Sequence, residues 1–234
     1  MKTLIAAAAL TAATLVGATP ALAQEEDTSE FKISGNVGIV SDYRFRGVSL
    51  SGRGPAIQAT VHASKGAFFA EGFVTSLGRG ESDAPVETDI SVGAEHKLGK
   101  GTATLSATWY LYPGDHHAGV YEVIGRYDLP VGRATLSATA GYAPGQHALH
   151  GRDNLYLGLS ATVPVGRPQI IASIGREKGA LSPGTKIDWQ LGAQMDVAGF
   201  NASVSYIDSD RSYRDRHGRN LSSATILLQI GHSF

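Results

Sequence analysis

The chain has 234 residues, with 20 basic and 21 acidic side chains, a formal net charge of −1 and no cysteine. This near-zero charge excludes the extended basic face that nucleic-acid binding requires. The lack of cysteine excludes disulfides, thiolate metal sites, thiol nucleophiles and lipid anchors on an acylated cysteine.

The first 23 residues have the three-part pattern of a cleavable secretory signal peptide. Lys2 supplies the positive charge, an Ala/Leu-rich run covers 4–16, and small residues end at Ala23. The apolar run is short for a spanning helix, which argues against the alternative of an N-terminal membrane anchor. We expect cleavage ahead of Gln24, so that residues 24–234 form the mature chain with 19 basic and 21 acidic residues.

Strict alternation of apolar and polar residues recurs along the mature chain, as is typical of strands with two different faces. In 102–112, the odd-numbered residues from Ala103 to Leu111 are apolar, and the even-numbered residues are Thr, Ser or Tyr. The pattern predicts strands near 31–46, 54–64, 68–76, 86–97, 102–112, 120–128, 134–143, 154–164, 169–177, 187–196, 200–208 and 223–234. With no linker between them, they form one all-β domain of about twelve strands.

The connections between these strands alternate between tight turns and longer polar segments. The tight turns lie near 65–67, 98–101, 129–133, 165–167 and 197–199. The longer connections are 49–53, 77–85, 113–119, 145–153, 178–186 and 209–222. An up-and-down outer-membrane barrel needs this order, with short periplasmic turns and long external loops.

The composition of the two faces indicates which one points outward. The polar face is mostly Thr, Ser, Gly, Gln and Asn, and the mature chain has only six lysines, whereas a water-facing outer surface is usually richer in Lys and Glu. We therefore expect the apolar face to meet lipid. Aromatic residues near strand ends are predicted to form the two interfacial girdles. They are Tyr43, Phe45, Trp109, Tyr121, Tyr127, Tyr142, Trp189 and Phe200. In the alternative, a soluble lipocalin-like barrel, they would be core residues.

In the last predicted strand, the residues that share one face are Ile226, Leu228, Ile230, His232 and Phe234. A terminal Phe on such a strand resembles the signature by which barrel-assembly machinery recognises outer-membrane proteins. We expect that machinery, outer-membrane lipid and lipopolysaccharide to be partners of a transmembrane β-barrel in the bacterial outer membrane.

Several segments resemble the TorF-like family, a group of porin-like proteins formerly classed as conserved proteins of unknown function. They are Ser34-Gly35-Asn36-Val37, the run from Ser41 to Ser49, Pro55-Ala56-Ile57-Gln58, Tyr110-Leu111-Tyr112-Pro113-Gly114 and Tyr121-Glu122. The resemblance implies a channel role and says nothing about the solute. We expect no cofactor. Leu50 and Thr75-Ser76 depart from the family pattern.

If the apolar face meets lipid, charged residues of the other face line the lumen. The predicted pore-lining residues are Asp42, Arg44, Arg46, Glu71, Glu87, Asp89, Glu95, Glu122, Arg126 and Asp188. Guanidinium groups opposite carboxylates across a narrow pore select solutes by charge and size. The alternative is that these residues pair to neutralise one another and brace the wall. Twelve strands leave a narrow pore, which long-loop residues such as Arg53 can narrow further.

Long loops hold two other candidate sites. Five histidines could capture a transition metal, but no carboxylate pattern accompanies them, so we expect solvated side chains and no metal site. They are His116, His117, His147, His150 and His217. Four arginines at 211, 214, 216 and 219 are interleaved with Asp208, Asp210 and Asp215 and could bind lipopolysaccharide phosphates. The alternative is a generic hydrated loop.

Three other functions compete with a porin-like channel that is not an enzyme. A structural or adhesin-like barrel would lack transport, and a soluble barrel would bind lipid. An outer-membrane lipid hydrolase would use Ser and His on the outer wall, where His96 and His232 fall. No Ser/His/acid constellation supports that reading.

Overall fold

The computed structural model describes residues 30–78, 84–115 and 118–234. The predicted signal peptide, its cleavage site and the histidines at 116 and 117 lie outside these residues. Within them, no helix is long and apolar enough to cross a bilayer.

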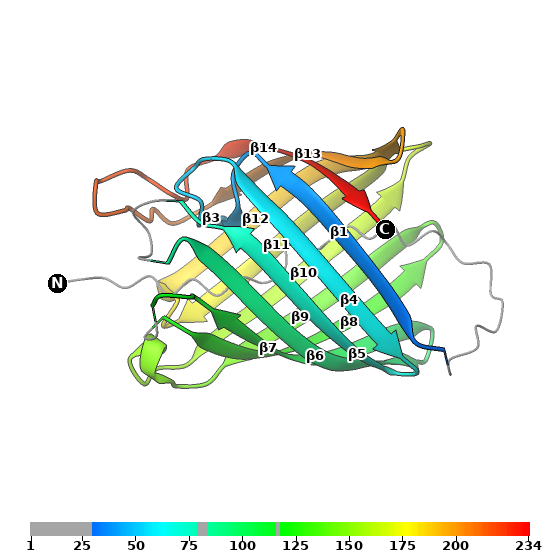
Figure 1. Ribbon diagram of the computed structural model, residues 1–234, viewed down its shortest axis with the longest axis horizontal. Coiled ribbons are helices and arrows are strands. Elements are labelled where there is room, and N and C mark those ends of the chain that lie inside the picture. The colour runs from blue at the N-terminus through cyan, green and yellow to red at the C-terminus, as the bar shows by residue number, and fades with distance from the viewer. Residues whose placement is uncertain (1–29, 79–83, 116–117) are drawn as a thin grey trace.

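Twelve antiparallel strands close into one barrel, in which each strand pairs with its neighbours in sequence and β1 pairs with β14 (Figure 1). They are β1 (Lys32–Val40), β4 (Ala56–Lys65), β5 (Phe68–Ser76), β6 (Val86–Leu98), β7 (Gly101–Leu111), β8 (Val120–Val131), β9 (Ala134–Ala143), β10 (Asn154–Pro164), β11 (Gln169–Gly179), β12 (Ser182–Val197), β13 (Phe200–Ser209) and β14 (Thr225–Ser233). The predicted all-β, up-and-down barrel of twelve strands is confirmed.

The alternating sequence places apolar side chains on the outside of the barrel. Ile33, Leu105 and Leu159 are each more than 60% exposed, whereas their polar neighbours in sequence face the interior. Since successive side chains of a strand point to opposite faces, one pattern determines both surfaces. The reading of a soluble barrel with its apolar face inward is therefore wrong.

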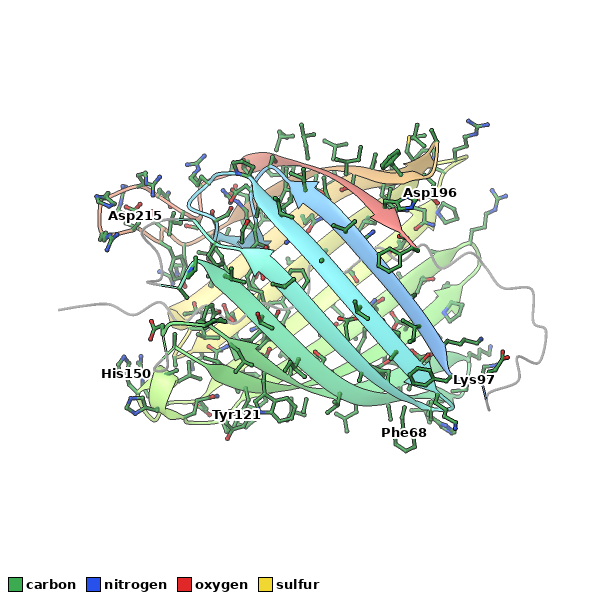
Figure 2. All side chains as sticks on the ribbon, viewed as in Figure 1. Phe68, Lys97, Tyr121, His150, Asp196 and Asp215 are labelled. Carbon is green, nitrogen blue, oxygen red and sulfur yellow. The ribbon has the colours of Figure 1, made fainter. Side chains whose placement is uncertain are left out.

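Exposed aromatic rings gather near both ends of the outer surface. Trp109, Tyr121, Tyr142 and Tyr206 lie toward the long connections, and Phe31, Phe68, Phe200 and Phe234 lie toward the tight turns. The rings of Tyr121 and Phe68 point away from the wall in Figure 2. Tyr43 and Phe45, predicted to belong to these girdles, are instead buried, because their segment folds into the barrel.

The barrel interior changes along its length. Near the tight turns, inward side chains such as Asn36 and Thr104 remain partly exposed to water. Near the long connections, the interior is packed by a small core that includes Val40, Phe73 and Tyr110. The barrel is thus hollow at the tight-turn end and filled at the other.

Two predicted strand boundaries are wrong. The segment 31–46 is not one strand: β1 ends at Val40, and the following residues turn inward. The segment 178–186 is not a long loop, because β11 and β12 continue into a short hairpin with Gly179 opposite Ser182. In the first case loop residues were assigned to a strand, and in the second case strand residues were assigned to a loop.

The seam between β1 and β14 closes the barrel. Its pairing runs only from Asn36 opposite Ser233 to Val40 opposite Gln229, and mutual backbone hydrogen bonds between Gly35 and Phe234 extend it by one step. On its other edge, β1 pairs with β4 along its whole length, from Lys32 to Val40. The seam is therefore the shortest pairing in the wall.

Candidate functional site

Residues 41–55, which we call the inner loop, join β1 to β4 and fold into the lumen. They contain a small hairpin of β2 (Arg44–Phe45) and β3 (Val48–Ser49), all four residues of which are buried. Arg46 and Gly47 form its two-residue turn with φ values of 45° and 84°. A hairpin turn of this kind requires positive φ at both central positions. An arginine held there is strained by about 1–3 kcal/mol, so its side chain must be fixed by its surroundings.

Arg46 extends from the hairpin tip to two strands of the barrel wall. Its Nη2 donates to both carboxylate oxygens of Glu122 on β8 (2.8 and 2.9 Å), and its Nη1 donates to Glu177 Oε1 on β11 (2.7 Å). All three side chains are almost completely buried. Buried ion pairs are costly to break because the remaining charge has no solvent. Arg46 therefore fastens the inner loop to the wall.

Further contacts complete this charged cluster. Lys186 on β12 donates through Nζ to Glu177 Oε2 (2.7 Å) and to the backbone oxygen of Arg46 (2.7 Å). The guanidinium lies over the ring of Tyr156 on β10, with 4.0 Å from Cζ to the ring centroid. The Tyr110 hydroxyl donates to Glu122 Oε2 (3.2 Å). The hairpin tip thus contacts one arc of the wall, the one that runs from β8 to β12.

Two glycines of the wall make room for these groups. A Cβ at Gly141 on β9 would lie 2.6 Å from Glu122 Oε1 and 3.0 Å from Arg46 Nη2. A Cβ at Gly175 on β11 would collide with the Tyr156 ring. Both positions tolerate no side chain while the cluster is intact.

Valine at Gly141 is expected to weaken the docking of the inner loop, because the Glu122 carboxylate would have to leave its ion pair. Trypsin treatment of the folded barrel, followed by mass spectrometry, should then detect cleavage after Arg46, which is protected in the parent protein. Gly125→Val on β8 is the matched control, since a Cβ there meets nothing within 4 Å. Equal protection of the Arg46 peptide bond in both variants would contradict the conclusion that the Arg46 cluster fastens the inner loop to the wall.

The base of the inner loop has its own network. Arg44 Nε donates to Asp42 Oδ2 (2.7 Å), and Arg44 Nη1 donates to the backbone oxygens of Gly47 (3.1 Å) and Ser223 (2.9 Å). The Ser49 hydroxyl donates to Asp42 Oδ1 (2.5 Å). These bonds satisfy polar groups inside the barrel, where an unpaired group is costly.

Residues 210–224, which we call the final loop, cover the inner loop from outside (Figure 2, near Asp215). The Ser49 amide donates to the backbone oxygen of Leu221 (2.9 Å), and Arg53 Nη1 donates to Ser223 Oγ (2.6 Å). Asp215 orders the final loop by accepting from Arg219. Desolvation raises the pKa of Asp215, but hydrogen bonds from the Arg219 side chain and from two backbone amides lower it by more. The pKa of Asp215 therefore lies below its usual value.

The structure distributes the predicted pore-lining residues over three settings. Asp42, Arg44 and Arg46 were predicted to lie on a first strand at 31–46. They lie instead on the inner loop, because β1 ends at Val40. Glu87, Asp89, Glu122 and Asp188 are buried in the filled half. Glu71, Glu95 and Arg126 stand in the hollow half, where Glu71 faces His62 (3.3 Å) and Arg126 pairs with Asp128 (2.7 Å).

Sequence reasoning missed three members of the Arg46 cluster. Glu177 lies near the end of a predicted strand, Lys186 falls in a predicted loop, and Tyr156 was not singled out. Glu177 and Lys186 could have been found from the sequence by placing a short hairpin between them, because such a hairpin pairs the two residues directly across β11 and β12. Among the described residues, no group of three or more His, Asp or Glu side chains could hold a metal ion.

Comparisons with known proteins agree with the barrel. A family model described as "Bacterial protein of unknown function (Gcw_chp)" matches residues 24–234. None of the curated proteins compared with the chain matches its sequence. Among solved structures, the chain is similar to a KdgM porin (TM-score 0.60, 8% identity, 86% of this chain and 99% of that chain) and to a NanC porin (0.58, 12%, 86% and 98%). A further match is the COG4313 outer membrane channel from Pseudomonas putida F1 (0.51, 8%, 90% and 98%). At these identities the similarity establishes the fold.

Proposed function

The chain belongs to the Gcw_chp family of bacterial proteins of unknown function, and from this premise we propose that it is a porin-like channel of the outer membrane for passive diffusion of small solutes. The porin role that the TorF-like resemblance implies is part of this proposal. The observation that carries it is the polar, water-accessible lumen that ends at the Arg46 hairpin.

The outer surface supports a place in a membrane. A band of exposed aliphatic side chains surrounds the barrel between the two sets of aromatic rings. Transmembrane barrels show such a band between aromatic girdles at the two interfaces. In the proposed orientation, the long connections face outward and the tight turns face the periplasm.

The lumen supports restricted passage. The inner loop fills the half near the long connections, where Arg46 and its two carboxylate partners are almost fully buried. A solute can therefore cross only when the inner loop shifts, and we expect a low conductance that opens in brief steps. The proposed cargo is limited to small solutes, and the channel carries out no chemistry.

The test is the conductance of the refolded protein in planar bilayers with a panel of ions and small solutes. Stepwise currents are the expected result. A barrel that inserts and stays silent would support the structural or adhesin-like alternative, and fatty-acid release from labelled phospholipid would support a hydrolase.

Replacing both Arg44 and Arg46 by alanine is expected to shift ion selectivity toward cations. The change removes two positive charges from a constriction that keeps the buried carboxylates Asp42, Glu122 and Glu177. Charged rings in a narrow pore set its selectivity. The measurement is the reversal potential in a salt gradient across a planar bilayer, and an unchanged potential would argue against a filter role for these arginines.

We also propose two partners outside the lumen. Barrel-assembly machinery would recognise β14 with the exposed ring of Phe234. Lipopolysaccharide phosphates would meet the arginines of the final loop, although Arg219 already pairs with Asp215 and Arg214 donates to the backbone oxygen of Gly218.

Removing Phe234 should lower the yield of assembled barrel in cells, measured by its heat-modifiable mobility in gels.

A further inference from the structure

Two buried carboxylates on the inner face of β6, those of Glu87 and Asp89, have no counter-charge beside them in the part of the chain that the structure describes. Glu87 is 0% exposed and Asp89 is 2% exposed. Glu87 Oε1 accepts a hydrogen bond from the Tyr43 hydroxyl (2.7 Å), and the Tyr112 side chain also hydrogen-bonds to Glu87. Glu87 Oε2 and both oxygens of Asp89 have no hydrogen-bond partner. No ion pair among the described residues includes either carboxylate.

The buried cations are committed elsewhere. Arg46 and Lys186 both bind Glu177, and Arg44 binds Asp42. None of these three side chains forms an ion pair with Glu87 or Asp89. A buried carboxylate without a counter-charge is strongly unfavourable, so it must take up a proton or bind a cation.

Aromatic rings stand on both sides of Asp89. Its direct cross-strand neighbours are Phe73 on β5 and Tyr110 on β7, and both are buried. Side chains in directly opposite positions are close neighbours on one face of a sheet. Tyr43 packs against Phe73 with 6.0 Å between ring centroids. Aromatic faces attract cations, and alkylated ammonium groups are bound in this way.

Asp89 lies next to the water-accessible half of the lumen. The next inward residue on β6 is Ser91, and the nearby Glu71 on β5 also faces the lumen; both are partly exposed. Asp89 therefore lies where the hollow half meets the filled half. Both Asp89 oxygens are closed to solvent in this conformation, so we expect a small ion from the tight-turn end to reach them only when the neighbouring side chains move.

From this arrangement we propose that Glu87 and Asp89, with the rings of Phe73 and Tyr110, form a binding subsite for the primary ammonium group of a small organic cation. The three unpartnered oxygens are acceptors, and a primary ammonium offers three N–H donors. The described residues offer no set of three ligands for a metal ion. The subsite deepens the proposed channel function, on which it rests, by naming the class of solute that pauses in the lumen.

The first measurement needs no conductance. Methylammonium chloride should raise the temperature at which the folded barrel loses its heat-modifiable mobility, in a saturable way and at constant ionic strength. Tetramethylammonium, which has no N–H donor, and potassium should produce a smaller rise. Asp89→Asn keeps the shape of the side chain and should abolish the difference between methylammonium and potassium.

The second measurement is the bi-ionic reversal potential in planar bilayers. The parent protein should prefer methylammonium over potassium, and Asp89→Asn should lose most of that preference. Glu95→Gln is the matched control, because it removes a carboxylate from the same face of β6 at an exposed position. This variant should retain most of the preference.

The outcomes separate the two proposals. Equal effects of the three cations on the parent protein, or an Asp89→Asn variant with the parent's response, would overturn the subsite, and the carboxylates would then be protonated. A saturable, Asp89-dependent methylammonium effect in a barrel that never conducts would overturn the channel and leave the subsite standing.

Discussion

Replacing Arg46 by alanine is expected to raise the conductance of the barrel and to expose the inner loop to protease, while the twelve strands remain folded. The change leaves Glu122 and Glu177 facing each other without the guanidinium that both bind. Removing one partner of a buried ion pair costs about 3–5 kcal/mol. At about 1.4 kcal/mol per factor of ten, the equilibrium between the docked and undocked inner loop would shift toward the undocked states by roughly two to four orders of magnitude.

Two variants make this test specific. Arg53→Ala removes an exposed arginine of the same loop and should change the conductance little. The Arg53 guanidinium donates to Asn220 and Ser223 of the final loop and not to the wall. Combining Arg46→Met with Glu122→Gln removes one positive and one negative charge from the cluster, leaves Glu177 paired with Lys186, and should restore part of the docking. Trypsin cleavage after Arg44, identified by mass spectrometry, reports undocking in each case. If Arg46→Ala kept the parent conductance and protection, the hairpin would not be what closes the lumen.

An arginine at Leu159 is expected to destabilise the barrel in a bilayer by about 2–4 kcal/mol, as charged residues do on the lipid face at the midplane of transmembrane barrels. Leu159 is central in β10 and 63% exposed on the outer surface. An arginine on the water-facing surface of a soluble barrel would cost far less. The measurement is the free energy of unfolding by denaturant after folding into lipid vesicles.

Val165, in the turn after β10, provides the control for depth. It is 55% exposed, which is close to the value for Leu159, but it lies at the rim of the barrel. Val165→Arg should cost only about 0–1 kcal/mol, because the penalty falls toward the membrane interface. Similar costs at both positions would contradict the proposed placement in a membrane.

Alternation predicted most of the barrel because it records a boundary between two environments. Along β7, for example, each side chain points to one face or the other, so the change from Leu105 to Ser106 marks outside and inside. The same rule set most strand ends within a few residues. It predicts nothing about which strands pair at the closure, which depends on the whole chain.

The inner loop was missed because its residues continue the pattern of the strand before it. Tyr43 and Phe45 share the parity of Ile39, so a strand up to Arg46 and an inward hairpin produce the same alternation. The distinguishing signal was local: Arg46-Gly47 stands between Phe45 and Val48, and a glycine-containing pair between apolar residues marks a two-residue hairpin. Whether such a hairpin points into or away from the lumen is decided by partners distant in sequence.

Candidate charges could be predicted as a set but not as pairs. All ten predicted pore-lining residues were chosen by parity, which says nothing about depth. Asp89 and Glu95 lie on the same face of the same strand but at different depths in the barrel. Asp89 is buried beside the inner loop, whereas Glu95, six residues further along the strand, is exposed. Contacts such as Arg46 with Glu177 span 131 positions in sequence, so they follow from the closed barrel alone.

The short seam between β1 and β14 has a consequence for the order of folding. Every other pairing in the wall joins consecutive strands and can form as a local hairpin, whereas the seam joins residues near Asn36 to residues near Ser233. Contacts between such distant segments form slowly, because nearly the whole chain must be ordered first. Until then β1 and β14 each present a free hydrogen-bonding edge, which is a template for aggregation. We therefore expect the pairing of β1 with β14 to be the slowest step of folding and the step before which the chain is most prone to aggregate.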